Sequence, residues 1–105
     1  MAASLDGAAL ALWREVPVTV SDGTVLRADV WRPAAGEPVP AILVRTPYGK
    51  ERAVPSGVLD PATAVAAGFC VVIQDVRGTG SSGGSFEPYV NEAADGFDTI
   101  GWLAA

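Results

Sequence analysis

Residues 40–50, PAILVRTPYGK, and residues 68–84, GFCVVIQDVRGTGSSGG, decide the fold of this chain. Each stretch contains a continuous apolar run, residues 41–44 in the first and residues 69–73 in the second. Apolar runs without alternation are typical of strands buried on both faces of a parallel sheet. Each run leads into a loop, and α/β proteins place their sites at the carboxyl ends of parallel strands. The two stretches therefore predict two central strands of an α/β enzyme, each followed by a loop that can carry chemistry.

The segment before these strands predicts an antiparallel β-hairpin. Residues 16–20, VPVTV, and residues 25–32, VLRADVWR, both alternate in polarity, as strands with one buried face do. Between them lies the pair Asp22-Gly23, which readily adopts the positive φ of a tight turn. We expect the other face of the hairpin, which carries Asp29, to lie in solvent.

Helices are predicted on either side of the second central strand. Asp60 followed by Pro61 is typical of a helix start, so a short helix should join the central strands in a right-handed crossover. Residues 91–105 predict a second helix, whereas residues 1–14 have no clear period and suggest a short helix or an irregular lead-in. On the second helix the predicted buried face is Ala93, Phe97, Ile100 and Ala104. The predicted solvated carboxylates near and on it are Glu87, Glu92, Asp95 and Asp98.

Composition narrows the class of protein. The chain has 105 residues, which allow one small domain, and half of them are apolar, as in globular proteins. A net charge of −5 argues against nucleic acid as a partner. The N-terminal segment lacks the pattern of a signal peptide or membrane span, so we expect a cytoplasmic protein without a membrane partner. The single cysteine, Cys70, is expected to be buried in a strand, and no metal site is predicted because no histidine is present to join the carboxylates.

The glycine-rich loop matches two functional motifs. Gly78, Gly80 and Gly83 satisfy GxGxxG after a strand, which is the dinucleotide-binding fingerprint. That fingerprint must open a helix, and Pro88 blocks an immediate one. Ser82 occupies the nucleophile position of a GxSxG match, but a nucleophile elbow needs a sharp strand-to-helix turn, which is absent from the pattern here. We therefore favour a structural glycine-serine loop and keep nucleotide binding as an alternative.

Tyr48 is the residue of the first loop that could act in catalysis. It follows a buried strand, where a phenol can point into an active site and donate a hydrogen bond. A tyrosine in a surface turn is the alternative, and the residue pattern by itself favours that alternative.

Four segments of the chain resemble one enzyme family. These segments are VPVTVSDGTVLRADVWRP, PAILVRTPYGK, GFCVVIQDVRGTGSSGGSF and NEAADGFDTIGWL. In this order and spacing, from Val16 to Leu103, they resemble the start of the catalytic domain in the cocaine esterase and Xaa-Pro dipeptidyl-peptidase (CocE/NonD) family of α/β-hydrolases. The resemblance implies an α/β fold with a partial α/β-hydrolase sheet: an N-terminal β-hairpin, a parallel β-α-β unit and a C-terminal helix. It also implies that residues 1–105 are the N-terminal part of a single catalytic domain, ending before the nucleophile elbow.

The same resemblance implies a function. It assigns Tyr48 the role of oxyanion-hole donor in a serine hydrolase that acts on an ester or on a peptide bond after proline. It leaves the catalytic Ser, Asp and His outside this chain, so the chain alone is expected to be inactive, and it implies no cofactor. Asp75 and Arg77 resemble structural residues that shape the glycine-rich loop. The expected partner is a small ester or short peptide substrate; a nucleotide-binding module and a non-catalytic interaction domain are the alternatives.

Overall fold

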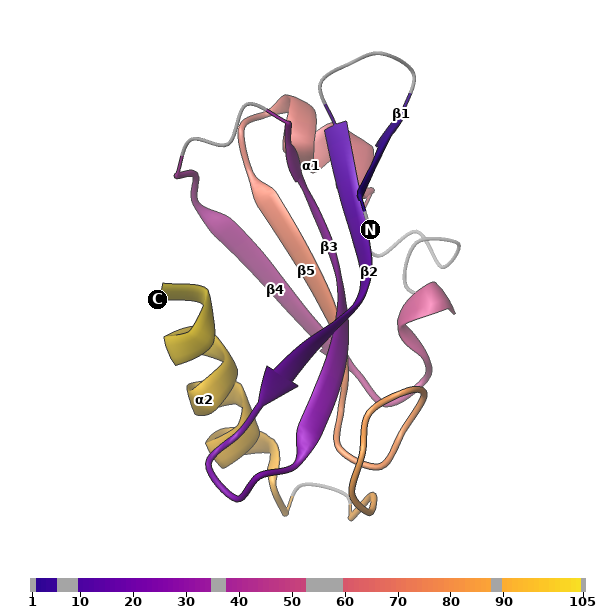
Figure 1. Cartoon of the computed structure of the whole chain (residues 1–105), viewed down its shortest axis with the longest axis vertical. Helices are drawn as coiled ribbons and strands as arrows, with labels where there is room; N and C mark the ends of the chain where they lie inside the picture. The colour runs from indigo at the N-terminus through magenta and orange to yellow at the C-terminus, as the bar shows by residue number, and fades with distance from the viewer. Residues whose placement is uncertain (1, 6–9, 35–37, 53–59, 88–89, 105) are drawn as a thin grey trace.

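A computed structural model describes residues 2–5, 10–34, 38–52, 60–87 and 90–104, which form a twisted mixed sheet with a helix on each face (Figure 1). Neither helix in this part of the chain is long and apolar enough to cross a membrane. The spatial order of the strands is β1-β2-β3-β5-β4. The elements are β1 (Ala2–Leu5), β2 (Leu10–Thr19), β3 (Val25–Pro33), β4 (Ala41–Thr46), the 3-10 turn η1 (Lys50–Arg52), α1 (Pro61–Ala66), β5 (Cys70–Asp75) and α2 (Glu92–Ala104).

The two central strands pair as predicted. β4 and β5 are parallel and in register from Ala41 opposite Cys70 to Thr46 opposite Asp75, with α1 as the crossover between them. Every residue of β5 is buried, but β4 is only half-buried because it forms one edge of the described sheet. Since β4 and β5 end level with each other, the loops that follow them begin side by side.

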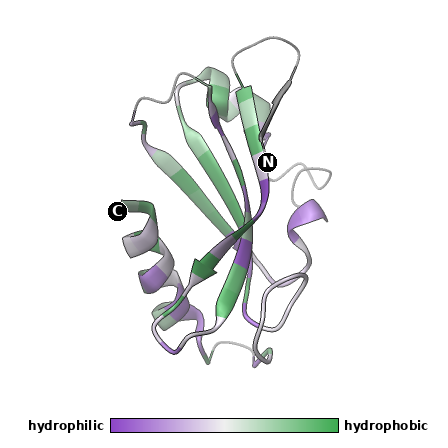
Figure 2. Cartoon of the chain, in the orientation of Figure 1, coloured by the Kyte–Doolittle hydropathy of each residue, from purple (hydrophilic) through white to green (hydrophobic). Residues whose placement is uncertain are grey.

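Alternate residues of β5 build the core on opposite faces of the sheet. Val71 and Ile73 pack with α1, whereas Cys70 and Val72 pack with α2, in agreement with the hydrophobic colouring of β5 in Figure 2. The predicted burial of Cys70 is confirmed. The α1 side includes Ala64 and Val65 from the helix, and the α2 side includes Trp102 and Leu103.

The hairpin is present, but two expectations about this region were wrong. Residues 2–5 and 10–14 are strands rather than a helix or irregular lead-in, because β1 pairs with β2 through backbone hydrogen bonds that need no side-chain period. The face of β3 that carries Asp29 and Trp31 is buried rather than wet, because β3 lies between β2 and β5 and Trp31 packs with the core on the α1 side. The predicted turn is confirmed, with a φ of 88° at Gly23.

Helix α2 packs through a different face from the predicted one. Phe97 and Ile100 are exposed, with 76% and 60% of their surfaces accessible, whereas Asp95 and Thr99 are buried. On the inward side, the Arg77 guanidinium holds the Asp95 carboxylate with N–O distances of 3.0 and 2.8 Å, and Trp102 and Leu103 pack against the sheet. The expectation of solvated carboxylates is therefore wrong for Asp95, whereas Glu87 is exposed and Glu92 and Asp98 are partly exposed. Glu92 pairs with Arg45, and Asp98 accepts hydrogen bonds from Ser21.

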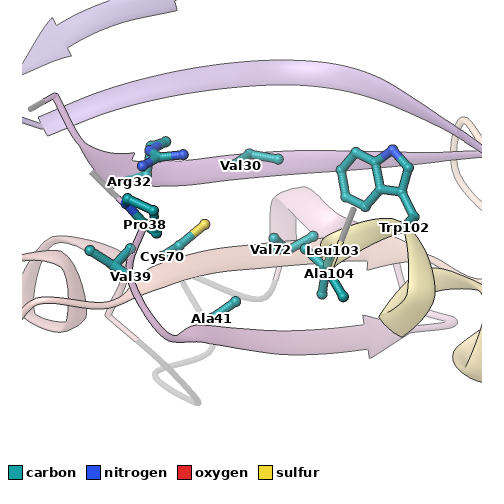
Figure 3. A pocket seen from close by; sticks show the side chains of 10 residues that line it. All are labelled: Val30, Arg32, Pro38, Val39, Ala41, Cys70, Val72, Trp102, Leu103 and Ala104. Carbon is teal, nitrogen blue, oxygen red and sulfur yellow. The ribbon is translucent and has the colours of Figure 1, made fainter. Parts of the chain in front are cut away.

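A cavity of about 610 Å³ lies between the carboxyl-terminal turn of α2 and the sheet (Figure 3). Trp102 and Leu103 of α2 line it together with Ala41 and Cys70, the first residues of β4 and β5. It therefore lies near the amino ends of the parallel strands. Sites in α/β sheets form at the carboxyl ends of the strands, so this cavity lies at the end of the sheet opposite to the one where a functional site is expected.

Candidate functional site

Tyr48 lies in the loop that follows the carboxyl end of β4. Its backbone N–H donates to Oγ1 of Thr46 at 3.1 Å, and the next residue, Gly49, has a φ of 96° that only glycine adopts readily. The side chain of Tyr48 is exposed, with 78% of its surface accessible. Its backbone is thus held locally while its phenol remains free to meet a ligand.

Asp75 joins the Tyr48 loop to the glycine-rich loop. This last residue of β5 is fully buried, and its Oδ1 accepts the Lys50 N–H at 2.7 Å. Its Oδ2 accepts the Ser81 N–H at 3.0 Å. A Cβ added at Gly80 would lie 2.2 Å from Oδ2, so glycine is needed where the second loop crosses this carboxylate. The structural role predicted for Asp75 is confirmed.

The side chain of Lys50 is buried beneath the same two loops. Its ammonium donates to Ser81 Oγ at 3.0 Å, to Asp75 Oδ2 at 3.3 Å and to Glu15. Burial by itself would lower the pKa of Lys50, but the hydrogen bond to Glu15 and the charge of Asp75 outweigh it and raise the pKa above the ordinary value. Chiefly because of its hydrogen bond to Lys50, the pKa of Glu15 is lowered. The charged ammonium of Lys50 therefore links the glycine-rich loop, the end of β5 and β2 through hydrogen bonds.

Glu15 reaches Lys50 from an irregularity in β2. The register of β2 against β3 shifts between Trp13 and Val16, and Glu15 has a φ of 57°, which is uncommon for a residue other than glycine. Its N–H donates to Asp29 Oδ1 at 3.1 Å. Burial raises the pKa of Asp29. The bulge thus turns a strand residue toward the loops at the carboxyl ends of β4 and β5.

The side chain of Arg77 connects the glycine-rich loop to α2 and to the hairpin turn. Its guanidinium pairs with Asp95 of α2 and with Asp22 of the hairpin turn, the latter at 2.6 Å, and also donates to Thr24 at 3.0 Å. The hydrogen bond to Arg77 is the main reason that the pKa of Asp22 is lowered well below its usual range. One side chain therefore ties three elements together, which confirms the structural role predicted for Arg77.

The glycine-rich loop folds against its own chain. The Gly78 N–H donates to the Gly83 carbonyl at 2.8 Å, and a Cβ at Gly78 would lie 2.1 Å from the backbone nitrogen of Phe86. The loop is not followed directly by a helix, since residues 85–87 are not helical. Ser82 donates to the Asp75 carbonyl at 2.6 Å and accepts from the Arg27 N–H at 2.8 Å. These contacts give a structural reason for the residues that match the dinucleotide-binding (GxGxxG) and nucleophile (GxSxG) motifs.

The family of the chain follows from a comparison with family models. Residues 22–105 match the model of the X-Pro dipeptidyl-peptidase (S15) family. The chain belongs to this family. A relative of the chain, the cocaine esterase of Rhodococcus sp. (strain MB1 Bresler), is 42% identical over 90 residues, which are 84% of this chain and 16% of that enzyme.

Solved structures agree with the S15 assignment. An α-amino acid ester hydrolase has a TM-score of 0.73 at 26% identity, over 98% of this chain and 20% of the other. A CocE/NonD family hydrolase from Staphylococcus aureus has a TM-score of 0.79 at 24% identity and shares the fold, over 89% of this chain and 20% of the other. The chain thus spans about a fifth or less of the length of these relatives. The predicted family and α/β fold are confirmed.

Part of this candidate site was predicted from the sequence, and part was not. The positions of Tyr48 and Asp75 at strand ends were expected, whereas the buried roles of Lys50 and Glu15 were not. The sequence holds only two local signals of these roles: Lys50 is the last residue of the RTPYGK segment, and Glu15 immediately precedes the regular alternation of residues 16–20. In the described part of the chain, no group of three or more Cys, Asp or Glu side chains could hold a metal ion.

Ser82→Ala in an S15 protein that contains this chain should retain most of the hydrolytic activity. The hydroxyl is engaged with two backbone groups of its own chain, so its loss should affect stability by about 1–3 kcal/mol rather than chemistry. Steady-state kinetics on an ester substrate provide the measurement. A loss beyond about 10³-fold, the scale for a triad nucleophile, would show that Ser82 performs the chemistry after all.

Proposed function

We propose that this chain forms the N-terminal part of the catalytic domain of a serine hydrolase that cleaves an ester, or an amide bond after proline. Membership of the S15 family supports hydrolysis, and the names of relatives include an esterase and an amino acid ester hydrolase. The observation that carries the proposal is the exposed phenol of Tyr48 on a braced loop at the carboxyl end of β4. A cytoplasmic location stays a prediction of the sequence.

In the proposed reaction, a serine Oγ attacks the substrate carbonyl while a histidine takes its proton and later gives it to the leaving group. The Tyr48 hydroxyl donates a hydrogen bond to the oxyanion of the tetrahedral intermediate, beside a backbone N–H. This chain contains no histidine, so the serine-histidine pair would come from the rest of the protein. The contribution of residues 1–105 is therefore one oxyanion donor and the scaffold that holds it.

Nucleotide binding by Gly78, Gly80 and Gly83 gains no support from the loop geometry. The dinucleotide fingerprint uses glycines so that a pyrophosphate can approach the backbone at a helix start. Here Gly78 and Gly80 instead make room for Phe86 and Asp75 of the same chain. Hydrolysis is accordingly the function that we put forward.

The test compares two proteins, the isolated 105-residue chain and a longer S15 protein that contains it. The longer protein should hydrolyse a p-nitrophenyl ester or an Xaa-Pro p-nitroanilide and should be inactivated by a fluorophosphonate, which labels nucleophilic serines. The isolated chain should show neither hydrolysis nor labelling. Activity that survives complete treatment with the fluorophosphonate would contradict the serine mechanism, and the preferred substrate would separate esterase from peptidase.

A further inference from the structure

We infer that Asp75 is a positioning residue for Tyr48, acting through the backbone of the loop that carries the phenol. The inference rests on the proposed function, in which Tyr48 donates to the oxyanion. Asp75 itself is fully buried and lies behind the loop, so it acts without touching the substrate. Its carboxylate is the point at which the Tyr48 loop is attached to the central strand β5.

The attachment is geometrically well defined. Tyr48 lies between two fixed points: its own N–H is bound to Thr46 Oγ1 at 3.1 Å, and the Lys50 N–H is bound to Asp75 Oδ1 at 2.7 Å. Only Gly49 separates Tyr48 from the second point. A backbone N–H bound to a buried carboxylate is a charge-assisted hydrogen bond, which is shorter and stronger than a neutral one. The position of the Tyr48 Cα therefore follows the position of the Asp75 carboxylate.

The second oxygen of Asp75 fixes the carboxylate in place. Oδ2 accepts from the Ser81 N–H at 3.0 Å and from the Lys50 ammonium at 3.3 Å, so the group cannot rotate without losing partners. Gly80 passes so close that any side chain there would displace it. An oxyanion donor must lie about 2.7–3.1 Å from the developing charge, and a displacement of about 1 Å can cost roughly 10²-fold in rate. The rigidity of Asp75 thus has a direct consequence for the chemistry at Tyr48.

A double-mutant cycle on the longer S15 protein tests this inference. Asp75→Asn keeps the shape of the side chain but turns an amide NH₂ toward one of the two backbone donors. We expect kcat on a p-nitrophenyl ester to fall by about 10- to 100-fold, with a smaller change in KM. In the Tyr48→Phe background the same substitution should cost less than about threefold, because the hydroxyl that Asp75 positions is already absent.

A second pair of variants tests the inference even if the Asp75→Asn protein misfolds. Gly80→Ala keeps the carboxylate but pushes it from its place, and it should give the same non-additive loss with Tyr48→Phe. Gly68→Ala is the matched control: Gly68 also has a positive φ, 98°, but its added Cβ meets nothing within 4 Å, so kcat should stay unchanged. Additive losses in both cycles would overturn the inference. A Tyr48→Phe protein with wild-type kcat would instead overturn the oxyanion role on which the inference rests.

Discussion

Tyr48→Phe in the longer S15 protein should lower kcat by about 10²–10³, with a smaller change in KM. The substitution removes one hydroxyl, and an oxyanion-hole donor is worth roughly 3–4 kcal/mol in the transition state. KM should change less because the negative charge develops only after the substrate is bound. Steady-state kinetics on an ester substrate at saturating concentration measure the effect directly.

The fold should tolerate this substitution. The side chain of Tyr48 is 78% exposed, and its described hydrogen bond comes from the backbone N–H rather than from the hydroxyl. If Tyr48→Phe turns over like the wild type, the oxyanion role is wrong and the tyrosine belongs to an ordinary surface turn.

Lys50→Met should lower the free energy of unfolding by about 3 kcal/mol. The side chain of Lys50 is 1% exposed, and its ammonium lies 3.3 Å from the buried Asp75 carboxylate. Removal of one member of a buried ion pair costs about 3–5 kcal/mol, because the remaining charge loses its partner without regaining water. We expect the lower end because Asp75 keeps the N–H groups of residue 50 and Ser81. Urea unfolding of the wild-type and variant proteins gives the difference.

Glu15→Gln is the matched control for this stability effect. Half of the Glu15 side chain is exposed, and ion pairs with an exposed member contribute about 1 kcal/mol or less. The glutamine should therefore cost at most about 1 kcal/mol. Equal losses for Lys50→Met and Glu15→Gln would mean that the exposed pair, and not the buried one with Asp75, stabilises the loops.

Local signals were sufficient for the framework of the fold. The apolar run of residues 69–73 is buried as β5, the Asp22-Gly23 pair forms the turn, and Asp60 caps α1 by accepting from the Ala62 N–H at 3.2 Å. Each of these features depends on residues a few positions apart, and backbone conformation and hydrophobic periodicity are local properties. The same holds for Tyr48, whose place after an apolar strand could be read from the sequence.

Tertiary contacts decided which polar side chains are buried. Lys50 meets Asp75 across 25 positions and Glu15 across 35, and Arg77 meets Asp95 across 18. None of these pairs leaves a periodic mark in the sequence, so residue spacing did not predict which charged side chains would be paired, and Asp95 was expected in solvent. The same is true of α2, where Asp95 pairs with Arg77 on the inward side and the predicted apolar residues Phe97 and Ile100 are exposed.

The sequence by itself therefore determined the hairpin turn, the parallel pair of strands with its crossover, and the position of Tyr48 after the first strand of that pair. The tertiary structure decided how Tyr48 is held. A buried carboxylate needs hydrogen-bond donors from several directions at once, and only the meeting of the loops after β4 and β5 supplies the Lys50 and Ser81 donors around Asp75. Glu15 of β2 completes the arrangement by accepting from the Lys50 ammonium. Such an arrangement is a property of three-dimensional proximity, which residue spacing along a single chain does not encode.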